Sequence, residues 1–144
     1  MKLVITSGYF NPLHRGHVSY LEEAKKLGDK LFVIVNNDMQ VKLKGSKEFL
    51  DEKERELIVK ALRVVDFAQV SSSHDKSVGS DLVDIRKKFP KEKLIFAKGG
   101  DRVLGNLPQS EIDACKNGNI EMVFNVGEEK IQSSSKILEK MHSK

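Results

Sequence analysis

The sequence contains little cysteine and no long apolar segment. Cys115 is the one cysteine among 144 residues, which excludes an intramolecular disulfide, and nothing near it has the spacing of metal ligands. The opening run from Met1 to Ile5 is shorter than the apolar stretch of about 7–15 residues that a signal peptide needs. We therefore expect a cytoplasmic protein that makes no use of a membrane.

Aromatic residues are also scarce, at 6% of the chain, and no DNA- or RNA-binding signature is present. The formal net charge of +4 and the isoelectric point near 9.1 would suit nucleic acid, but they attract small phosphorylated ligands equally well. We expect small anionic ligands and no nucleic acid, with a basic nucleic-acid binder as an alternative. Hydrophobic residues make up 39% and charged residues 32%, a composition typical of one globular domain, here residues 1–144.

Short apolar runs rich in branched residues alternate with helical patterns along the chain. Runs without polar alternation are typical of strands that are buried on both faces. The predicted strands are Lys2–Thr6, Lys30–Asn36, Phe67–Val70, Lys93–Lys98 and Ile120–Val126. Strands that alternate with helices form parallel sheets through right-handed crossovers. The fold prediction is therefore α/β, a Rossmann-like, doubly wound, five-stranded parallel sheet in a single domain.

The helices between these strands are predicted from apolar spacing and from capping residues. The first begins near Arg15 and is closed by Gly28 in a left-handed conformation. Asp51 and Glu54 form a capping box for a helix whose apolar face is predicted to contain Leu57, Ile58, Ala61, Leu62 and Val65. Further helices are expected over Ser80–Phe89, from Ser110 to Gly118, and after the serines at 133–135.

Three loops follow predicted central strands, at 8–16, 36–47 and 98–108. In open parallel sheets, ligands bind beyond the carboxyl ends of the strands, where the strand order reverses. The first loop is "GYFNPLHRGH", and it places His14 and His17 beside Gly16 at the start of a helix. The positive end of a helix favours phosphate, and two imidazoles there can donate hydrogen bonds to oxygens that gain charge during phosphoryl or nucleotidyl transfer. The alternative is that both are ordinary loop histidines with satisfied hydrogen bonds.

The loop "GYFNPLHRGH" resembles the signature of the nucleotidyltransferase superfamily, in which a glycine, an aromatic residue, Phe and Asp or Asn precede HxGH. The resemblance continues in order through "HVSYLEEAKKLGDKLFVIVNND", "KLKG", "EKERELIVKALRVVD", "FAKGGD" and "SSSKI". This order is similar to that of the cytidylyltransferase-like branch. Its most similar members are the adenylyltransferase domain of ADP-heptose synthesis and then glycerol-3-phosphate cytidylyltransferase.

The resemblance implies an enzyme that joins a nucleoside triphosphate to a phosphorylated acceptor by direct in-line attack and releases pyrophosphate. It implies catalytic roles for His14, His17 and Lys44, and acceptor contacts for Asp38 and Arg102. The implied nucleotide-binding residues are Gly8, Tyr9, Phe10, Gly16, Arg55, Gly99, Gly100, Asp101, Ser133, Ser134 and Ser135. Mg²⁺ would be held mainly through the nucleotide phosphates, with no metal ligands from the protein. A homodimer is possible, because relatives often dimerise.

Each of these roles has a competing structural explanation. Lys44 could be a solvated lysine in a charged segment, and Arg55 could form salt bridges with the glutamates of its own helix. Gly99 and Gly100 could form a plain turn, and one of the three serines could simply cap a helix. For the whole chain, the alternative to an enzyme is a non-catalytic nucleotide-binding or sensing module.

Three features depart from the cytidylyltransferase-like pattern. Asn11 and Pro12 stand where that branch commonly has Asp and an aliphatic residue. Three serines replace a Ser-Thr-Thr type of sequence, and Arg102 replaces an aromatic residue. The expected acceptor is a phosphorylated sugar or polyol, such as heptose 1-phosphate or glycerol 3-phosphate. The expected nucleotide is ATP, slightly favoured over CTP.

Overall fold

Five parallel strands form one sheet in the computed structural model, which describes residues 1–100 and 104–127. The strands are β1 (Lys2–Gly8), β2 (Lys30–Val35), β3 (Phe67–Val70), β4 (Lys93–Ala97) and β5 (Glu121–Val123). Their order across the sheet is β3-β2-β1-β4-β5. The strand order reverses between β1 and β4, so their carboxyl ends border the switch point of the sheet. The predicted doubly wound fold is confirmed.

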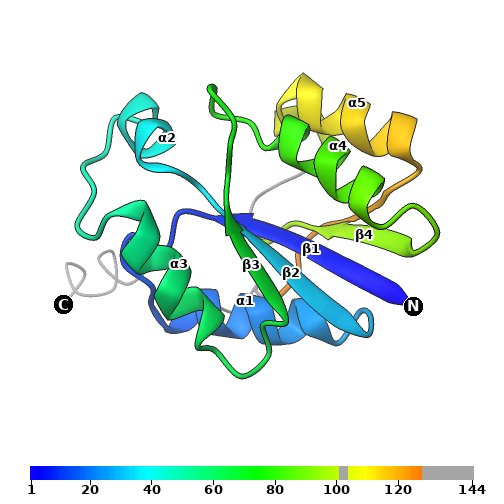
Figure 1. Cartoon of the computed structure of the whole chain (residues 1–144), viewed down its shortest axis with the longest axis horizontal. Coiled ribbons are helices and arrows are strands. Elements are labelled where there is room, and N and C mark those ends of the chain that lie inside the picture. The colour runs from blue at the N-terminus through cyan, green and yellow to red at the C-terminus, as the bar shows by residue number, and fades with distance from the viewer. Residues whose placement is uncertain (101–103, 128–144) are drawn as a thin grey trace, which may run out of the picture.

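Helices cover both faces of the sheet, with α1 and α3 on one face and α4 and α5 on the other (Figure 1). The helices are α1 (Arg15–Lys25), α2 (Asp38–Leu43), α3 (Glu52–Lys60), α4 (Gly79–Lys88) and α5 (Gln109–Gly118), with a 3₁₀ turn, η1, at Leu104–Asn106. Within the two described ranges, none of these helices has both the length and the apolar character needed to cross a membrane.

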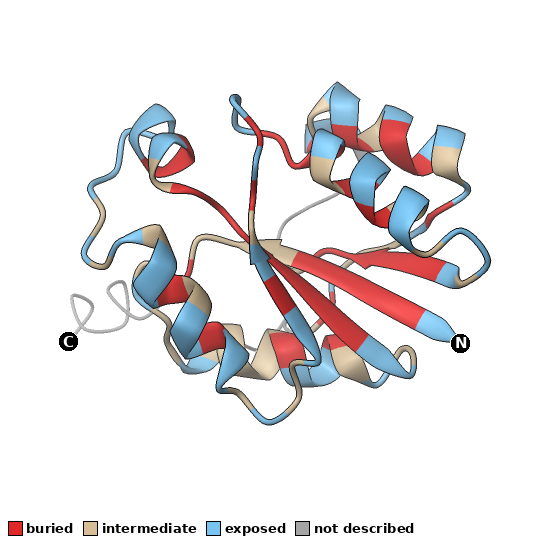
Figure 2. Ribbon diagram, viewed as in Figure 1, coloured by how far each residue is buried: buried red, intermediate tan, exposed pale blue. Residues whose placement is uncertain are grey.

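The core consists of two layers, because successive strand side chains point to opposite faces. Leu3 and Ile5 of β1 pack in the cluster that includes α4 and α5. Val4, between them, packs in the cluster that includes α1 and α3. The strands are buried along most of their length, whereas the outer sides of the helices are exposed (Figure 2).

Helix α2 was not predicted, because residues 36–47 were expected to form a loop. The helix begins with a reciprocal cap. The Asn37 side chain accepts a hydrogen bond from the Gln40 amide at 2.8 Å, and the Gln40 side chain accepts one from the Asn37 amide at 2.8 Å. The Asn-x-x-Gln signal is present in the sequence, but the helix is only one and a half turns long and has too few apolar residues to show a period.

The apolar face predicted for α3 was wrong within the helix, although Leu62 and Val65, which follow it, do pack against the core. Leu57 is 68% exposed and Ile58 is also exposed, whereas Arg55 and Val59 are buried. The helix is rotated so that the Arg55 guanidinium reaches oxygen atoms inside the protein. An arginine at a buried position cannot be recognised from apolar periodicity, because the pattern assigns charged residues to the outer face.

Two residues that were predicted to mark the end or the start of a helix have other roles. Gly28 does not adopt a positive φ angle; a Cβ atom there would lie 2.8 Å from a Val4 methyl carbon, so close packing requires the glycine. Helix α5 begins at Gln109 with Pro108 at its cap position, and Ser110 lies inside its first turn. Ser110 instead contacts the Ser77 hydroxyl.

Candidate active site

The loop after β1 folds back on itself around a buried aromatic ring. Phe10 is buried and has a φ angle of +49°, and a Cβ atom on Gly8 would lie 2.7 Å from its ring. The Gly8 carbonyl accepts a hydrogen bond from the Asn36 amide at 2.9 Å. Gly8 is therefore needed because a side chain there would clash with the Phe10 ring. The turn then leads directly to the start of α1, beyond the carboxyl ends of the strands.

The two motif histidines form the N-terminal cap of α1. Nδ1 of His14 accepts a hydrogen bond from the Gly16 amide at 3.0 Å, and Nδ1 of His17 accepts one from the His14 amide at 3.0 Å. The ring centroids are 3.9 Å apart. A neutral imidazole that accepts at Nδ1 carries its proton on Nε2. The cap therefore selects the Nε2–H tautomer for each ring in its neutral form, and this Nε2–H is the donor away from the cap.

His17 is held in its neutral form. Burial above all, together with repulsion from the neighbouring His14 and Lys44, lowers its pKa from 6.5 to about 4. Its ring also packs edge-on against Phe10, with 5.1 Å between centroids. At neutral pH, His17 is consequently a hydrogen-bond donor without a positive charge of its own.

The structure supports part of each interpretation of the two histidines, the structural and the functional one. The Nδ1 atoms serve the fold, as the structural explanation expects, while the Nε2–H groups have the tautomer that suits phosphate oxygens. The amide of Gly16 was expected to face a phosphate, but here it donates to His14. The His17 amide likewise donates to the His14 carbonyl at 3.0 Å. At these two positions, the imidazoles replace the backbone amides as the groups that can receive an anion.

Lys44 lies close to this pair. It is the C-terminal cap residue of α2, and its Nζ atom is 4.2 Å from the centroid of the Tyr9 ring. This distance is within the range of a cation–π contact. The side chain is exposed to solvent, and its charge acts on the pKa of His17. The structure therefore brings together Tyr9, His17 and Lys44, from three segments of the chain.

Asn11 ties the segment that follows Lys44 to the motif loop, a role that sequence reasoning missed. Its Nδ2 donates to the Lys47 carbonyl at 2.9 Å, and its Oδ1 accepts from the Phe49 amide at 2.8 Å. An aspartate could only accept, so it could make just one of these two bonds. The departure at Asn11 from the Asp of the family pattern therefore has a structural consequence.

Arg55 joins the ends of β1 and β2 from inside the protein. Its Nη1 donates to the carbonyls of Tyr9 at 2.8 Å and Asn36 at 2.6 Å, and its Nε donates to that of Leu50 at 3.0 Å. Its Nη2 forms an ion pair with Asp38 at 2.7 Å. Neither the expected nucleotide contact of Arg55 nor the expected acceptor contact of Asp38 is tested by this arrangement, but in the structure the two side chains bind each other. The alternative that Arg55 pairs with glutamates of α3 is wrong.

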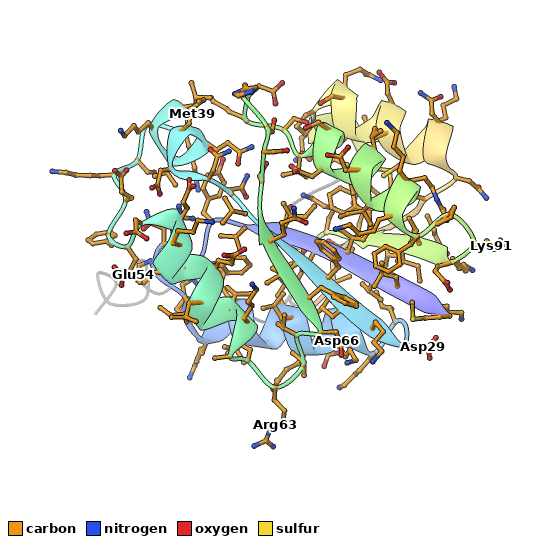
Figure 3. The ribbon with its side chains drawn as sticks, viewed as in Figure 1. Asp29, Met39, Glu54, Arg63, Asp66 and Lys91 are labelled. Atoms are coloured by element: carbon orange, nitrogen blue, oxygen red, sulfur yellow. The ribbon has the colours of Figure 1, made fainter. Side chains whose placement is uncertain are left out.

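Arg63 lies after the end of α3 and points away from the protein body (Figure 3). It is far from the positions where ligands are expected in this fold.

Gly99 and Gly100 follow β4 at the other side of the switch point. A Cβ atom on Gly99 would lie 3.0 Å from the Tyr20 ring and 3.0 Å from the Val126 carbonyl oxygen. Gly100 has a φ angle of +63° and open space around it. Both positions favour glycine, one for packing and one for conformation. Asp101, Arg102 and Ser133–Ser135 were also predicted to bind ligands, and they lie outside the described residues.

Metal-binding side chains do not gather at this site among the residues that the structure describes. Residues 1–100 and 104–127 contain no group of three or more His, Cys, Asp or Glu side chains that could hold a metal ion. Mg²⁺ held mainly through substrate phosphates and water, which the resemblance implies, stays a prediction.

Comparisons with known proteins agree with these features. The family model described as cytidylyltransferase-like matches residues 5–140. FAD synthase of Methanolacinia petrolearia is 37% identical over 101 residues, which cover 65% of this chain and 68% of that protein. Bifunctional protein HldE of Escherichia coli (strain K12 / DH10B) is 39% identical over 132 residues, which cover 83% of this chain and 27% of HldE. The chain thus spans about a quarter of the length of HldE.

Among solved structures, the lipopolysaccharide core biosynthesis protein from Thermoplasma volcanium GSS1 matches with a TM-score of 0.69 and 28% identity. The match covers 90% of this chain and 99% of that one. Fold, motif order and relatives therefore agree, and the chain belongs to the cytidylyltransferase-like family of nucleotidyltransferases.

Proposed function

We propose that this protein transfers a nucleoside monophosphate from ATP or CTP to a phosphorylated sugar or polyol and releases pyrophosphate. Heptose 1-phosphate and glycerol 3-phosphate are candidate acceptors, and ATP is slightly favoured as the donor. The observation that carries the proposal is the pair of capped imidazoles at the start of α1, whose Nδ1 atoms are taken by backbone amides. Two preorganised Nε2–H donors beside the switch point suit a reaction in which phosphate oxygens gain charge.

The transfer is a single displacement at the α-phosphorus. An oxygen of the acceptor phosphate forms a new bond to this phosphorus. The bond from the α-phosphorus to the oxygen that bridges to the β-phosphate breaks, and its electron pair leaves with pyrophosphate. No proton has to be abstracted from a phosphate oxygen that is already ionised, so the reaction needs no general base. No covalent intermediate with the protein forms.

His14 and His17 donate hydrogen bonds from Nε2 to oxygens of the transferred phosphate and of the leaving pyrophosphate. Neutrality of His17 suits this role, because the low pKa keeps its Nδ1 available to the His14 amide throughout the physiological range. Lys44 supplies positive charge from the side of Tyr9. Mg²⁺, bound through the triphosphate, would neutralise charge on the phosphates and orient them.

The direct test is calorimetric titration of the protein with MgATP and with MgCTP in identical buffer, followed by a screen of phosphorylated acceptors for pyrophosphate release. Saturable binding of one triphosphate and release of pyrophosphate with one acceptor class would support the proposal. Saturable binding without release across a broad acceptor panel would favour the non-catalytic nucleotide-binding module. Binding of the protein to duplex DNA, with an affinity that falls steeply as the salt concentration rises, would favour the nucleic-acid alternative.

A further inference from the structure

Helix α2, whose C-terminal cap is Lys44, has little apolar surface to hold it against the rest of the protein. Of its six residues only Gln40 and Val41 are buried, and Gln40 is 0% exposed. A helix this short is not stable by itself in water, so contacts with the rest of the protein must hold it in place. Polar contacts must therefore contribute much of what fixes the position of α2.

The buried side-chain amide of Gln40 joins α2 to a distant segment. Its Oε1 accepts hydrogen bonds from the Asn37 amide at 2.8 Å and from Asn36 Nδ2 at 3.1 Å. Its Nε2 donates to the carbonyls of Asp75 at 2.8 Å and Ser77 at 3.1 Å. A side-chain amide has two donor hydrogens, and both have a partner here. Gln40 therefore fastens α2 to the loop that follows β3.

Asn37, the N-terminal cap of α2, extends this attachment along the same loop. Its Nδ2 donates to the carbonyls of Ser71 and Ser73, both at 2.9 Å. The two side-chain amides thus bind four alternate carbonyls in residues 71–77, a segment without a helix or strand of its own. Buried carbonyls need a donor, and here α2 supplies it. Because hydrogen bonds are directional, the attachment fixes the orientation of α2 as well as its place.

Lys44 lies one helical turn beyond Gln40. Its backbone amide donates to the Gln40 carbonyl at 3.0 Å, so the helix itself connects the two residues. At the other end of the side chain, Nζ lies 4.2 Å from the centroid of the Tyr9 ring. The flexible stem of a lysine can compensate for a small movement of its backbone, but not for release of the whole helix. Loss of the attachment would therefore take the ammonium away from Tyr9.

We propose that Gln40 is a positioning residue for Lys44. By binding the loop after β3, its side-chain amide holds α2 so that the Lys44 ammonium lies over Tyr9, where it receives the phosphates of the nucleoside triphosphate. The inference rests on the proposed function and adds to it a residue that touches no substrate. It also gives the serine-rich loop at 71–77 a role, since the carbonyls of this loop hold the helix.

Two substitutions of Gln40 separate the helix cap from the attachment to the loop. Gln40→Glu keeps an oxygen for the Asn37 amide and loses the Nε2 donor, so the bonds to the loop are lost. Gln40→Met loses all four side-chain bonds. Met39→Gln is the matched control, because it makes the reverse exchange at the neighbouring residue of α2, which is 47% exposed (Figure 3). Circular dichroism confirms that each variant is folded before it is compared.

The position of Lys44 can be measured by NMR in the full chain without any ligand. In the wild type, the end of the Lys44 side chain lies over the face of the Tyr9 ring, so the ring current should shift its methylene signals upfield. This shift is expected to be lost in Gln40→Glu and in Gln40→Met. It should be kept in Met39→Gln.

Triphosphate affinity gives a second measurement, by calorimetric titration with MgATP and with MgCTP. Lys44→Met should weaken binding about 10–100-fold, the effect of losing one hydrogen bond to a charged group. Gln40→Glu should weaken it about 3–10-fold, because Lys44 is then less often in place. When Lys44 is already methionine, Gln40→Glu should change the affinity less than about twofold, since two residues that act through one contact are not additive.

The inference is overturned if the Lys44 signals of folded Gln40→Glu match those of the wild type, or if its triphosphate affinity does. It is also overturned if Gln40→Glu weakens binding equally with and without Lys44, because Gln40 would then support the fold in general. Failure of the proposed function has a different signature. The wild type would bind neither triphosphate or release no pyrophosphate with any acceptor, and the NMR comparison would still decide whether Gln40 positions Lys44.

Discussion

His17 is both a helix cap and a hydrogen-bond donor, and two substitutions can separate these roles because each preserves the function of one ring nitrogen. In His17→Asn, the side-chain oxygen can replace Nδ1 as the acceptor for the His14 amide, while the Nε2–H donor is lost. In His17→Gln, the longer side chain places an amide donor near the former Nε2 and leaves the cap incomplete.

The expected magnitudes differ by assay. Removing one preorganised donor to a developing charge costs about 2.7–4 kcal/mol in the transition state, so His17→Asn should lower kcat about 10²–10³-fold. Its melting temperature should stay close to that of the wild type. His17→Gln should retain more turnover than His17→Asn and lose about 0.5–2 kcal/mol of stability, the usual cost of a missing cap. His17→Ala should show both losses.

The assays are steady-state pyrophosphate release with saturating nucleotide and acceptor, and thermal unfolding followed by circular dichroism. A folded His17→Asn variant with wild-type kcat would refute the reasoning, since the Nε2–H would then have no part in the reaction. A large loss of stability in His17→Asn would instead show that the ring, and not its Nδ1 acceptor, supports α1.

Further predictions concern stability and the loop near Lys44. Burial, with smaller contributions from His14 and Lys44, lowers the pKa of His17 from 6.5 to about 4, so the unfolded chain binds more protons between these values. The free energy of unfolding should therefore fall as pH drops from about 6.5 to 4, by at most about 3 kcal/mol. Urea titrations across that range should show a smaller decrease for His17→Asn, and an equal decrease would contradict the assignment. Asn11→Asp loses the bond to the Lys47 carbonyl and should raise the KM for the triphosphate about 2–10-fold with little change in melting temperature; an unchanged KM would show that this tether does not position Lys44. Arg55→Met leaves Asp38 and three carbonyls without their donor and should cost about 3 kcal/mol or more in urea unfolding, whereas a loss below about 1 kcal/mol would mean that water replaces the guanidinium.

The sequence predicted the parts of the molecule that depend on neighbours along the chain. The positions of the strands and of most helices follow from apolar runs, and the two histidines were recognisable from their spacing at a strand-to-helix junction. The capping residues Asp51 and Asn37 have equally local signals, although the second was overlooked. Local patterns are sufficient there because each bond joins residues that are three positions apart.

Contacts between distant segments could not be predicted in the same way. Arg55 bonds to the carbonyl of Tyr9, and Asn11 to that of Lys47, and any residue type presents a carbonyl. The sequence therefore does not show which residue provides the accepting carbonyl. The burial of Lys98, whose Nζ lies 3.8 Å from the Glu111 carboxylate of α5, was missed for a related reason, because no local signal distinguishes a lysine exposed at the end of a strand from one that a helix covers.

The cap of α1 also bears on how the site responds to motion. The bonds that hold the two imidazoles span only residues 14–17, so the spacing between the rings is set within a single helical turn. Opening of the sheet, or movement of the segment after α2, would displace both rings together as one rigid unit. The pair of donors would thus survive fluctuations that separate it from Lys44, and only the approach of that charge would have to be re-established before each turnover.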